Sequence, residues 1–171
     1  MCPILSPWAD HCHGTAKTAN FVAAELTEKW NGMSTEAAAG FTALFRSSPF
    51  LDRTGPFYSK GTGQSLSIGL RILDHHLNAR GLAHGGVLLT MADIALGYAM
   101  ATSADPLVGA VTSQLSADFA GSATLGDWVE SRVDIQKIGK TLAFANVYLL
   151  VGDARIVRAS GVFAISARHG T

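Results

Sequence analysis

Residues 84–103 read HGGVLLTMADIALGYAMATS, and the predicted architecture follows from them. Its side chains are apolar on nearly every side of a helix, and Asp93 is the only charged residue between Gly85 and Asp105. A helix that is apolar all round must be wrapped by other structure. Asp93 interrupts the apolar run before it reaches the ~20 residues that a bilayer span needs, so the stretch predicts a buried helix.

Strand-like sequences flank this helix on both sides. Residues 64–73 alternate apolar and polar side chains with the period of a half-buried strand. Four further strand-like runs follow the helix, at residues 108–119, 127–138, 141–151 and 154–166. The short turns Gly139-Lys140 and Gly152-Asp153 predict antiparallel pairing of consecutive strands. The order predicts an α+β fold in which an antiparallel sheet curls around the helix.

The residues before this region predict two additional helices. Apolar residues at helical spacing predict the first within residues 15–31. Ser34 is a good N-cap for the second, which ends before Pro49. Glycines and prolines within residues 50–63 predict an ordered loop.

Composition excludes several classes of function. The 171 residues fit one domain. The 13 basic residues balance 13 acidic ones without a basic cluster, so we expect no nucleic-acid partner. Both cysteines, Cys2 and Cys12, lie near the N-terminus, which is typical of a reducing compartment. Residues 1–14 do not resemble a signal peptide, so we expect a cytoplasmic protein without a membrane partner.

Gly85 and Gly86 form the predicted N-terminus of the buried helix. Unpaired backbone N–H groups point outward there, and together with the helix dipole they attract partial negative charge. The pair is a candidate oxyanion hole, in which one donor can lower a barrier by ~3 to 4 kcal/mol. The alternative is that the glycines only permit a tight entry into the helix.

Asp93 is the second candidate, because burying a carboxylate costs several kcal/mol unless something compensates or uses it. A carboxylate in a dry site is a usual place for a tuned base or nucleophile. The alternative is a structural Asp that bonds to a neighbouring strand or subunit.

Helix geometry predicts that one site needs two chains. Asp93 lies eight residues beyond Gly85, or ~12 Å along a helix axis. One chain therefore cannot focus both groups on one carbonyl. If two chains pair with these helices antiparallel, Asp93 of one approaches Gly85 of the other. We expect a homodimer with two shared sites, paired further into a dimer of dimers.

The run Asn78-x5-His84-Gly85-Gly86-x6-Asp93 resembles the signature of the PaaI-like hot-dog thioesterases, the group that includes thioesterase superfamily member 2. Residues 139–145, GKTLAFA, are similar to the same family at a strand-turn-strand position. The similarity covers residues 64–166. It implies a hot-dog fold, in which an antiparallel sheet wraps a long central helix, and hydrolysis of acyl-CoA thioesters without a metal or cofactor.

The resemblance divides the chain into three parts. These are a mobile tail at residues 1–14, the two helices and loop at residues 15–63, and a hot-dog thioesterase domain at residues 64–171.

The same resemblance implies roles for individual residues. Asp93 would activate a water or attack the thioester carbonyl itself, while the Gly85 N–H of the partner subunit polarises that carbonyl. Asn78 and His84 would shape the loop around the thioester, and the Asn78 amide would act as a second polariser of the carbonyl or as a ligand to the incoming water. Thr112 would stand beside the carboxylate. Further candidates are Ser113, as the fallback for Thr112, and Gly86, as a substrate contact.

Each residue also has an ordinary interpretation. Asn78 could be a turn residue, His84 could fix the loop by hydrogen bonds, and Thr112 could simply favour a strand. His75 and His76 would point to opposite faces of a strand, so we assign them no role.

Two other functions fit the same fold. One is a non-catalytic acyl-CoA-binding protein, which would bind the thioester without turnover. The other is an acyl-CoA dehydratase. In that group a Pro-rich entry into the helix would be expected where this chain has Gly85-Gly86.

Overall fold

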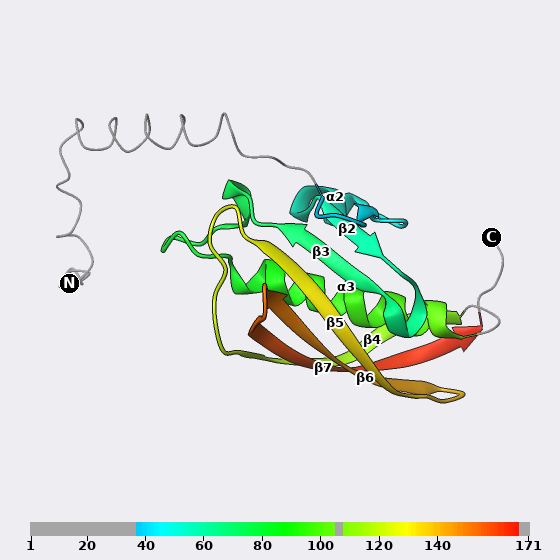
Figure 1. Ribbon diagram of the computed structural model, residues 1–171. Helices are drawn as coiled ribbons and strands as arrows, with labels where there is room; N and C mark the ends of the chain where they lie inside the picture. Colours follow the sequence, from blue (N-terminus) through cyan, green and yellow to red (C-terminus); the bar gives the residue numbers. More distant parts are fainter. Residues whose placement is uncertain (1–36, 105–107, 168–171) are drawn as a thin grey trace, which may run out of the picture. The chain divides into compact units, whose positions relative to one another are not determined.

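The computed structural model describes residues 37–104 and 108–167, which form a sheet around a long helix (Figure 1). That helix is α3 (Gly85–Ser103), and the short α2 (Pro49–Thr54) precedes it. The strands are β1 (Thr42–Ala43), β2 (Phe57–Lys60), β3 (Ser67–Arg71), β4 (Val108–Phe119), β5 (Trp128–Ile138), β6 (Leu142–Val151) and β7 (Ala154–Ala167). Two 3₁₀ turns, η2 (Gly63–Ser65) and η3 (Asp74–His76), flank β3.

The strand order is β1-β2-β3-β5-β6-β7-β4, and every neighbouring pair is antiparallel. The sheet curves around α3, which confirms the predicted hot-dog arrangement (Figure 1). α3 and the four strands that follow it begin and end within about one residue of their predicted bounds. β4 lies at one edge of the sheet and pairs with β7 alone among the described strands.

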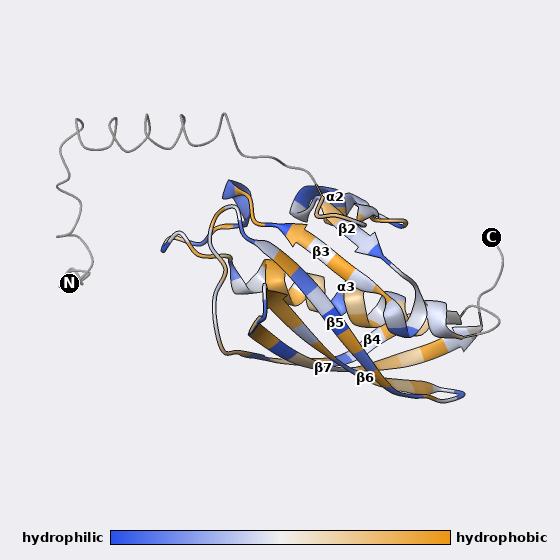
Figure 2. Ribbon diagram, viewed as in Figure 1, coloured by the Kyte–Doolittle hydropathy of each residue, from blue (hydrophilic) through white to orange (hydrophobic). Residues whose placement is uncertain are grey.

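The core lies between α3 and the concave face of the sheet. Met91, Ala95 and Leu96 on the helix are fully buried, as are Ile68 and Val147 on the strands. Figure 2 shows apolar residues along α3 and in alternation along the strands around it. Within the described chain, α3 is the one helix long and apolar enough to cross a membrane by length and composition, and more than half of it is buried in this core.

A β-bulge interrupts β4 beside the helix. Thr112 pairs with Phe163 and Gln114 pairs with Val162, so Ser113 is the extra residue. Side chains normally alternate between the two faces of a strand, and a bulge shifts that alternation by one residue. As a result Thr112 and Leu115, three residues apart, both line the cavity beside α3.

The prediction of a second N-terminal helix is wrong over its described part. Gly40 has a φ of 82°, in the left-handed region that ends a helix. After it, Thr42 and Ala43 pair with β2, and Phe41 packs edge-on against Trp128 with ring centroids 5.1 Å apart.

The predicted loop at residues 50–63 is also wrong, because it contains most of α2 and all of β2. Ser48 caps α2 by accepting a hydrogen bond from the Leu51 N–H, and Pro49 occupies the first helical turn, where proline is tolerated. β1 and β2 thus extend the sheet on the N-terminal side of residue 64. The predicted tail and the first predicted helix lie outside the described residues.

Candidate active site

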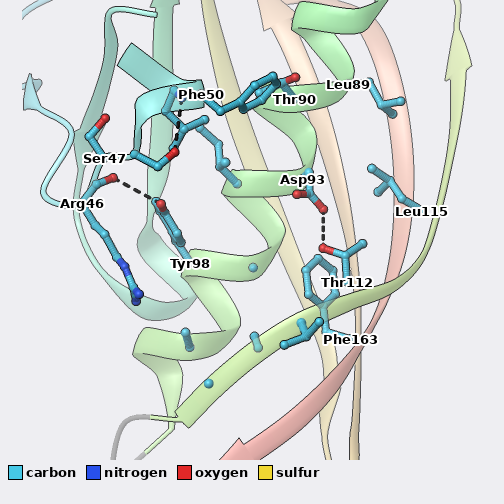
Figure 3. A pocket seen from close by; sticks show the side chains of 18 of the residues that line it. Arg46, Ser47, Phe50, Leu89, Thr90, Asp93, Tyr98, Thr112, Leu115 and Phe163 are labelled. Carbon is cyan, nitrogen blue, oxygen red and sulfur yellow. Dashed lines mark hydrogen bonds between the residues drawn. The ribbon is translucent and has the colours of Figure 1, made fainter. Parts of the chain in front are cut away.

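Asp93 and Thr112 meet on the flank of α3 that the sheet leaves uncovered. The Thr112 hydroxyl donates a hydrogen bond of 2.7 Å to Oδ1 of Asp93 (Figure 3). No described residue donates to Oδ2, so that oxygen is available to a water or a substrate. Asp93 is half-buried in the single chain, while Thr112 is exposed.

These two residues line a cavity of about 850 Å³ between α3, β4 and residues 46–51. Leu51, Ile94 and Phe163 supply apolar walls, and Gly86 lies at one end of the lining on the first turn of α3. The cavity therefore joins a carboxylate and a hydroxyl to an apolar space, as a hydrolytic site for an apolar group would require.

His84 caps the N-terminus of α3. The ring Nδ1 of His84 accepts a hydrogen bond of 2.9 Å from the Gly86 N–H. The backbone N–H of His84 donates to the His76 carbonyl at 2.7 Å. The Gly86 amide is therefore occupied. The Gly85 N–H has no acceptor among the described residues, so Gly85 supplies the free donor at this helix end.

Asn78 fixes the turn that leads to the helix. Its side-chain oxygen accepts hydrogen bonds from the N–H groups of Arg80 (2.8 Å) and Leu82 (3.4 Å). Its carbonyl accepts one from Gly81, which has a φ of 72°. Asn78 thus shapes this loop, and its side-chain NH₂ makes no hydrogen bond to a described residue.

One chain does not bring all the predicted residues together. Asp93, Thr112 and Gly86 line the cavity, whereas His84, Gly85, Asn78 and Ser113 do not. The helical rise of ~12 Å between Gly85 and Asp93 accounts for their separation.

His75 and His76 form a contact that the sequence did not reveal. The expectation that they point to opposite faces of a strand is wrong, since both lie in η3 and their Nε2 atoms reach the Gly55 carbonyl at 2.8 and 3.1 Å. His76 is only 2% exposed, and its Nδ1 accepts a hydrogen bond of 3.0 Å from the Leu73 N–H. Burial, followed by the charge of His75, lowers the pKa of His76.

The sequence does not indicate that Arg46 and Tyr98 lie together in the lining of the cavity. The Tyr98 hydroxyl donates to the Arg46 carbonyl at 3.2 Å, and its ring packs against Phe45 with centroids 5.3 Å apart. Burial raises the pKa of Tyr98; Arg46 lowers it and Asp93 raises it further. These residues escaped notice because Arg46 lies in the segment predicted as a helix, far from Tyr98 in sequence.

The described residues contain no group of three or more His, Cys, Asp or Glu side chains that could hold a metal ion.

Known proteins resemble this chain in sequence and in fold. The family model described as "Thioesterase superfamily" matches residues 80–158. "Putative esterase PA0474" of Pseudomonas aeruginosa is 48% identical over 125 residues, which are 72% of this chain and 93% of that protein.

Two solved structures share the fold. Zebrafish thioesterase superfamily member 2 gives a TM-score of 0.65 at 22% identity, covering 70% of this chain and 89% of that one. The protein smu.793 from Streptococcus mutans UA159, bound to acetyl-CoA, gives a TM-score of 0.62 at 20% identity, covering 75% of this chain and 96% of that one.

Proposed function

Since the chain belongs to the thioesterase superfamily, we propose that it hydrolyses acyl-CoA thioesters to a free acid and coenzyme A. Membership in the superfamily supports hydrolysis of thioesters or esters in general. The choice of a CoA thioester is supported by the acetyl-CoA bound to the structural neighbour smu.793.

The observation that carries the proposal is the hydrogen bond between Thr112 and Asp93 in an apolar cavity. It holds the carboxylate in one orientation and leaves Oδ2 free. As a general base, Oδ2 takes a proton from a water whose oxygen attacks the thioester carbonyl. The C–S bond then breaks, and the carboxyl returns the proton to the CoA sulfur, which leaves as the thiol. As a nucleophile, Oδ2 itself attacks the carbonyl, the C–S bond breaks to expel the CoA thiolate, and water then hydrolyses the acyl anhydride that has formed.

Gly85 of the partner subunit completes the proposed site. A backbone N–H at a helix N-terminus stabilises the oxyanion that forms on the carbonyl, and the Gly85 N–H is free for that role. His84 and Asn78 are positioning residues for this donor, because their hydrogen bonds fix the entry into α3.

Two features support a homodimer that shares its sites. β4 is an edge strand, whose outer backbone groups can pair with another chain. Val111 and Phe119 on that strand are 63% and 51% exposed, so pairing with a second chain there would remove apolar surface from water. The Phe119 ring also lies beside Gly85, 3.5 Å from where a Cβ on that glycine would stand. We therefore propose that β4 and the uncovered flank of α3 form the dimer interface.

The test is release of free thiol from a panel of acyl-CoAs, with gel filtration of each variant. Asp93→Asn is expected to lower kcat by at least about a hundredfold while the dimer stays intact, because it removes the base or nucleophile. Asp134→Asn, which changes an exposed carboxylate on β5, is the matched control and should keep full activity. Tight binding of acyl-CoA by the wild type without any turnover would instead identify a binding protein.

A further inference from the structure

The cavity beside Asp93 carries two opposite charges at different places in its lining. Of the described residues that line it, only Asp93 and Arg46 are charged. Ile94, Leu51 and Phe163 contribute apolar surface to the same lining. The Arg46 guanidinium forms no ion pair with any residue in the described ranges. Arg46 is exposed, so a ligand that binds its guanidinium replaces water there.

Tyr98 lies between the two charges and fixes one of them. Its hydroxyl donates to the Arg46 carbonyl, so the backbone that carries the guanidinium is attached to α3 (Figure 3). Asp93 and Arg46 shift the pKa of Tyr98 in opposite directions, which means that both charges lie within electrostatic reach of the phenol. The Arg46 side chain runs beside the Tyr98 ring in Figure 3.

We propose that this cavity binds the acyl group of the substrate and that Arg46 receives a carboxylate at the far end of that group. The substrate class is then the CoA monothioesters of dicarboxylic acids, an inference that rests on the proposed hydrolysis at Asp93. A guanidinium can bind a carboxylate through two parallel hydrogen bonds, whereas a methyl end offers it none. Arg46 is thus a specificity-determining residue, and Tyr98 is a positioning residue.

The rise of α3 between Asp93 and Tyr98, which holds the Arg46 backbone, gives a scale for the acyl group. Asp93 and Tyr98 are five residues apart on α3, which is ~7.5 Å along the helix axis. An extended chain advances about 1.2 Å per bond, so about six bonds span that distance. Acyl chains of about six carbons span this stretch of the helix and are the first to compare.

The experiment compares adipoyl-CoA with hexanoyl-CoA, which have the same chain length and differ by the terminal carboxylate. Free-thiol release gives kcat/KM for each, and their ratio is measured in the full-length wild type and in Arg46→Gln. We expect the wild type to prefer adipoyl-CoA, and the substitution to lower the ratio by about tenfold, the effect of losing a charge-assisted hydrogen bond. Tyr98→Phe should lower the ratio by a smaller factor, because it only releases the Arg46 backbone.

Arg53→Gln is the matched control, since Arg53 is exposed on α2 and does not line the cavity. It should change neither the two rates nor their ratio. A ratio that Arg46→Gln leaves unchanged overturns the inference, and an equal loss on both substrates assigns Arg46 to the CoA moiety that they share. In both cases hydrolysis persists, so the proposed function stands. A wild type that hydrolyses other acyl-CoAs of the panel but neither of these two would overturn this inference alone. A wild type that hydrolyses none of the panel would overturn the proposed function as well.

Discussion

Thr112 occupies one oxygen of the Asp93 carboxylate and leaves the other for chemistry. The bulge at Ser113 is the reason that Thr112 stands there, because regular alternation from Leu115 would turn Ser113 toward α3 instead. A hydroxyl held at 2.7 Å orients the carboxylate, so its loss should affect the reaction more than the fold.

We expect Thr112→Val to lower kcat for thioester hydrolysis by about tenfold or more, since a hydrogen bond to a charged group contributes roughly 1.5–3 kcal/mol. Valine keeps the shape and strand preference of threonine. Thr112→Ser keeps the hydroxyl and should retain most of the activity in the same steady-state assay. Equal kcat values for the valine variant and the wild type would exclude a role for the hydroxyl.

His76 should make stability depend on pH. Because its pKa in the folded chain is lowered, the unfolded chain binds more protons than the folded one as pH falls through the ordinary pKa of about 6.5. The contribution of His76 is therefore fully present above that pH and is lost below it. We expect the melting temperature to fall between about pH 7 and pH 5.

His76→Gln removes the titration and should reduce that fall, measured by thermal melts across this range. His75→Gln is the comparison variant, because His75 bonds to the same Gly55 carbonyl but is exposed. Its charge is the second cause of the lowered pKa of His76, after burial, so this variant should reduce the fall less than His76→Gln does. If both variants keep the pH dependence of the wild type, His76 is not its source.

The free Gly85 N–H in the first turn of α3 can be removed by substitution without breaking the helix. Gly85 is the first helical residue, a position that favours proline, and His84 has the extended backbone (φ −64°, ψ 134°) that precedes a proline well. Gly85→Pro removes only the N–H. We expect it to lower kcat by about 10²-fold, the effect of losing one oxyanion donor.

Gly85→Ala is the control for this change. It keeps the N–H, and its Cβ would meet the nearest ring atoms of Phe119 at an ordinary 3.5 Å. Circular dichroism of both variants checks that the helix survives. A fully active proline variant would show that this amide does not polarise the carbonyl.

The helix and the four strands after it could be predicted because their apolar patterns have clear periods. The second N-terminal helix could not be excluded, since Phe41, Leu44 and Phe45 fit helical spacing as well as they fit the observed turn and strand. The left-handed backbone at Gly40 and the pairing of residues 42–43 with β2 favour a strand over a helix here. Local helical spacing does not reveal that pairing.

The candidate site was predicted in part for the same reason. Asp93 stands out in the sequence as a charge in an apolar helix, and the structure brings it together with Thr112. Arg46 and Tyr98 meet across 52 residues, and nothing in either local sequence indicates that contact. The choice between Thr112 and Ser113 depends on a bulge that strand periodicity does not predict.

At the scale of the whole molecule, the described chain holds two halves of the proposed site at a distance. The carboxylate lies in the middle of α3 and the free amide lies at its start. In a two-fold symmetric dimer, the carboxylate of one chain would meet the free amide of the other, which gives two complete sites. A single chain would contain no complete site.

Mixing two inactive variants tests this arrangement. Asp93→Asn and Gly85→Pro each damage a different half, so a mixed dimer contains one intact site and one site with both defects. Random exchange of equal amounts should restore about a quarter of wild-type activity, because half of the dimers are mixed and each has one working site. Thiol release is measured before and after co-refolding. No recovery, with mixed dimers demonstrated by differently tagged chains, would show that each chain works alone.

The capping of α3 by His84 also affects which acyl bonds the proposed site could hydrolyse. His84 holds the Gly86 amide, so the approaching carbonyl meets one main-chain donor from this helix instead of two. A sulfur atom delocalises little electron density into its carbonyl, whereas oxygen esters and amides are protected by resonance and need stronger polarisation. In the proposed site, the occupied amide would limit hydrolysis to acyl groups that are already activated, and we expect ordinary ester and peptide bonds to survive contact with it.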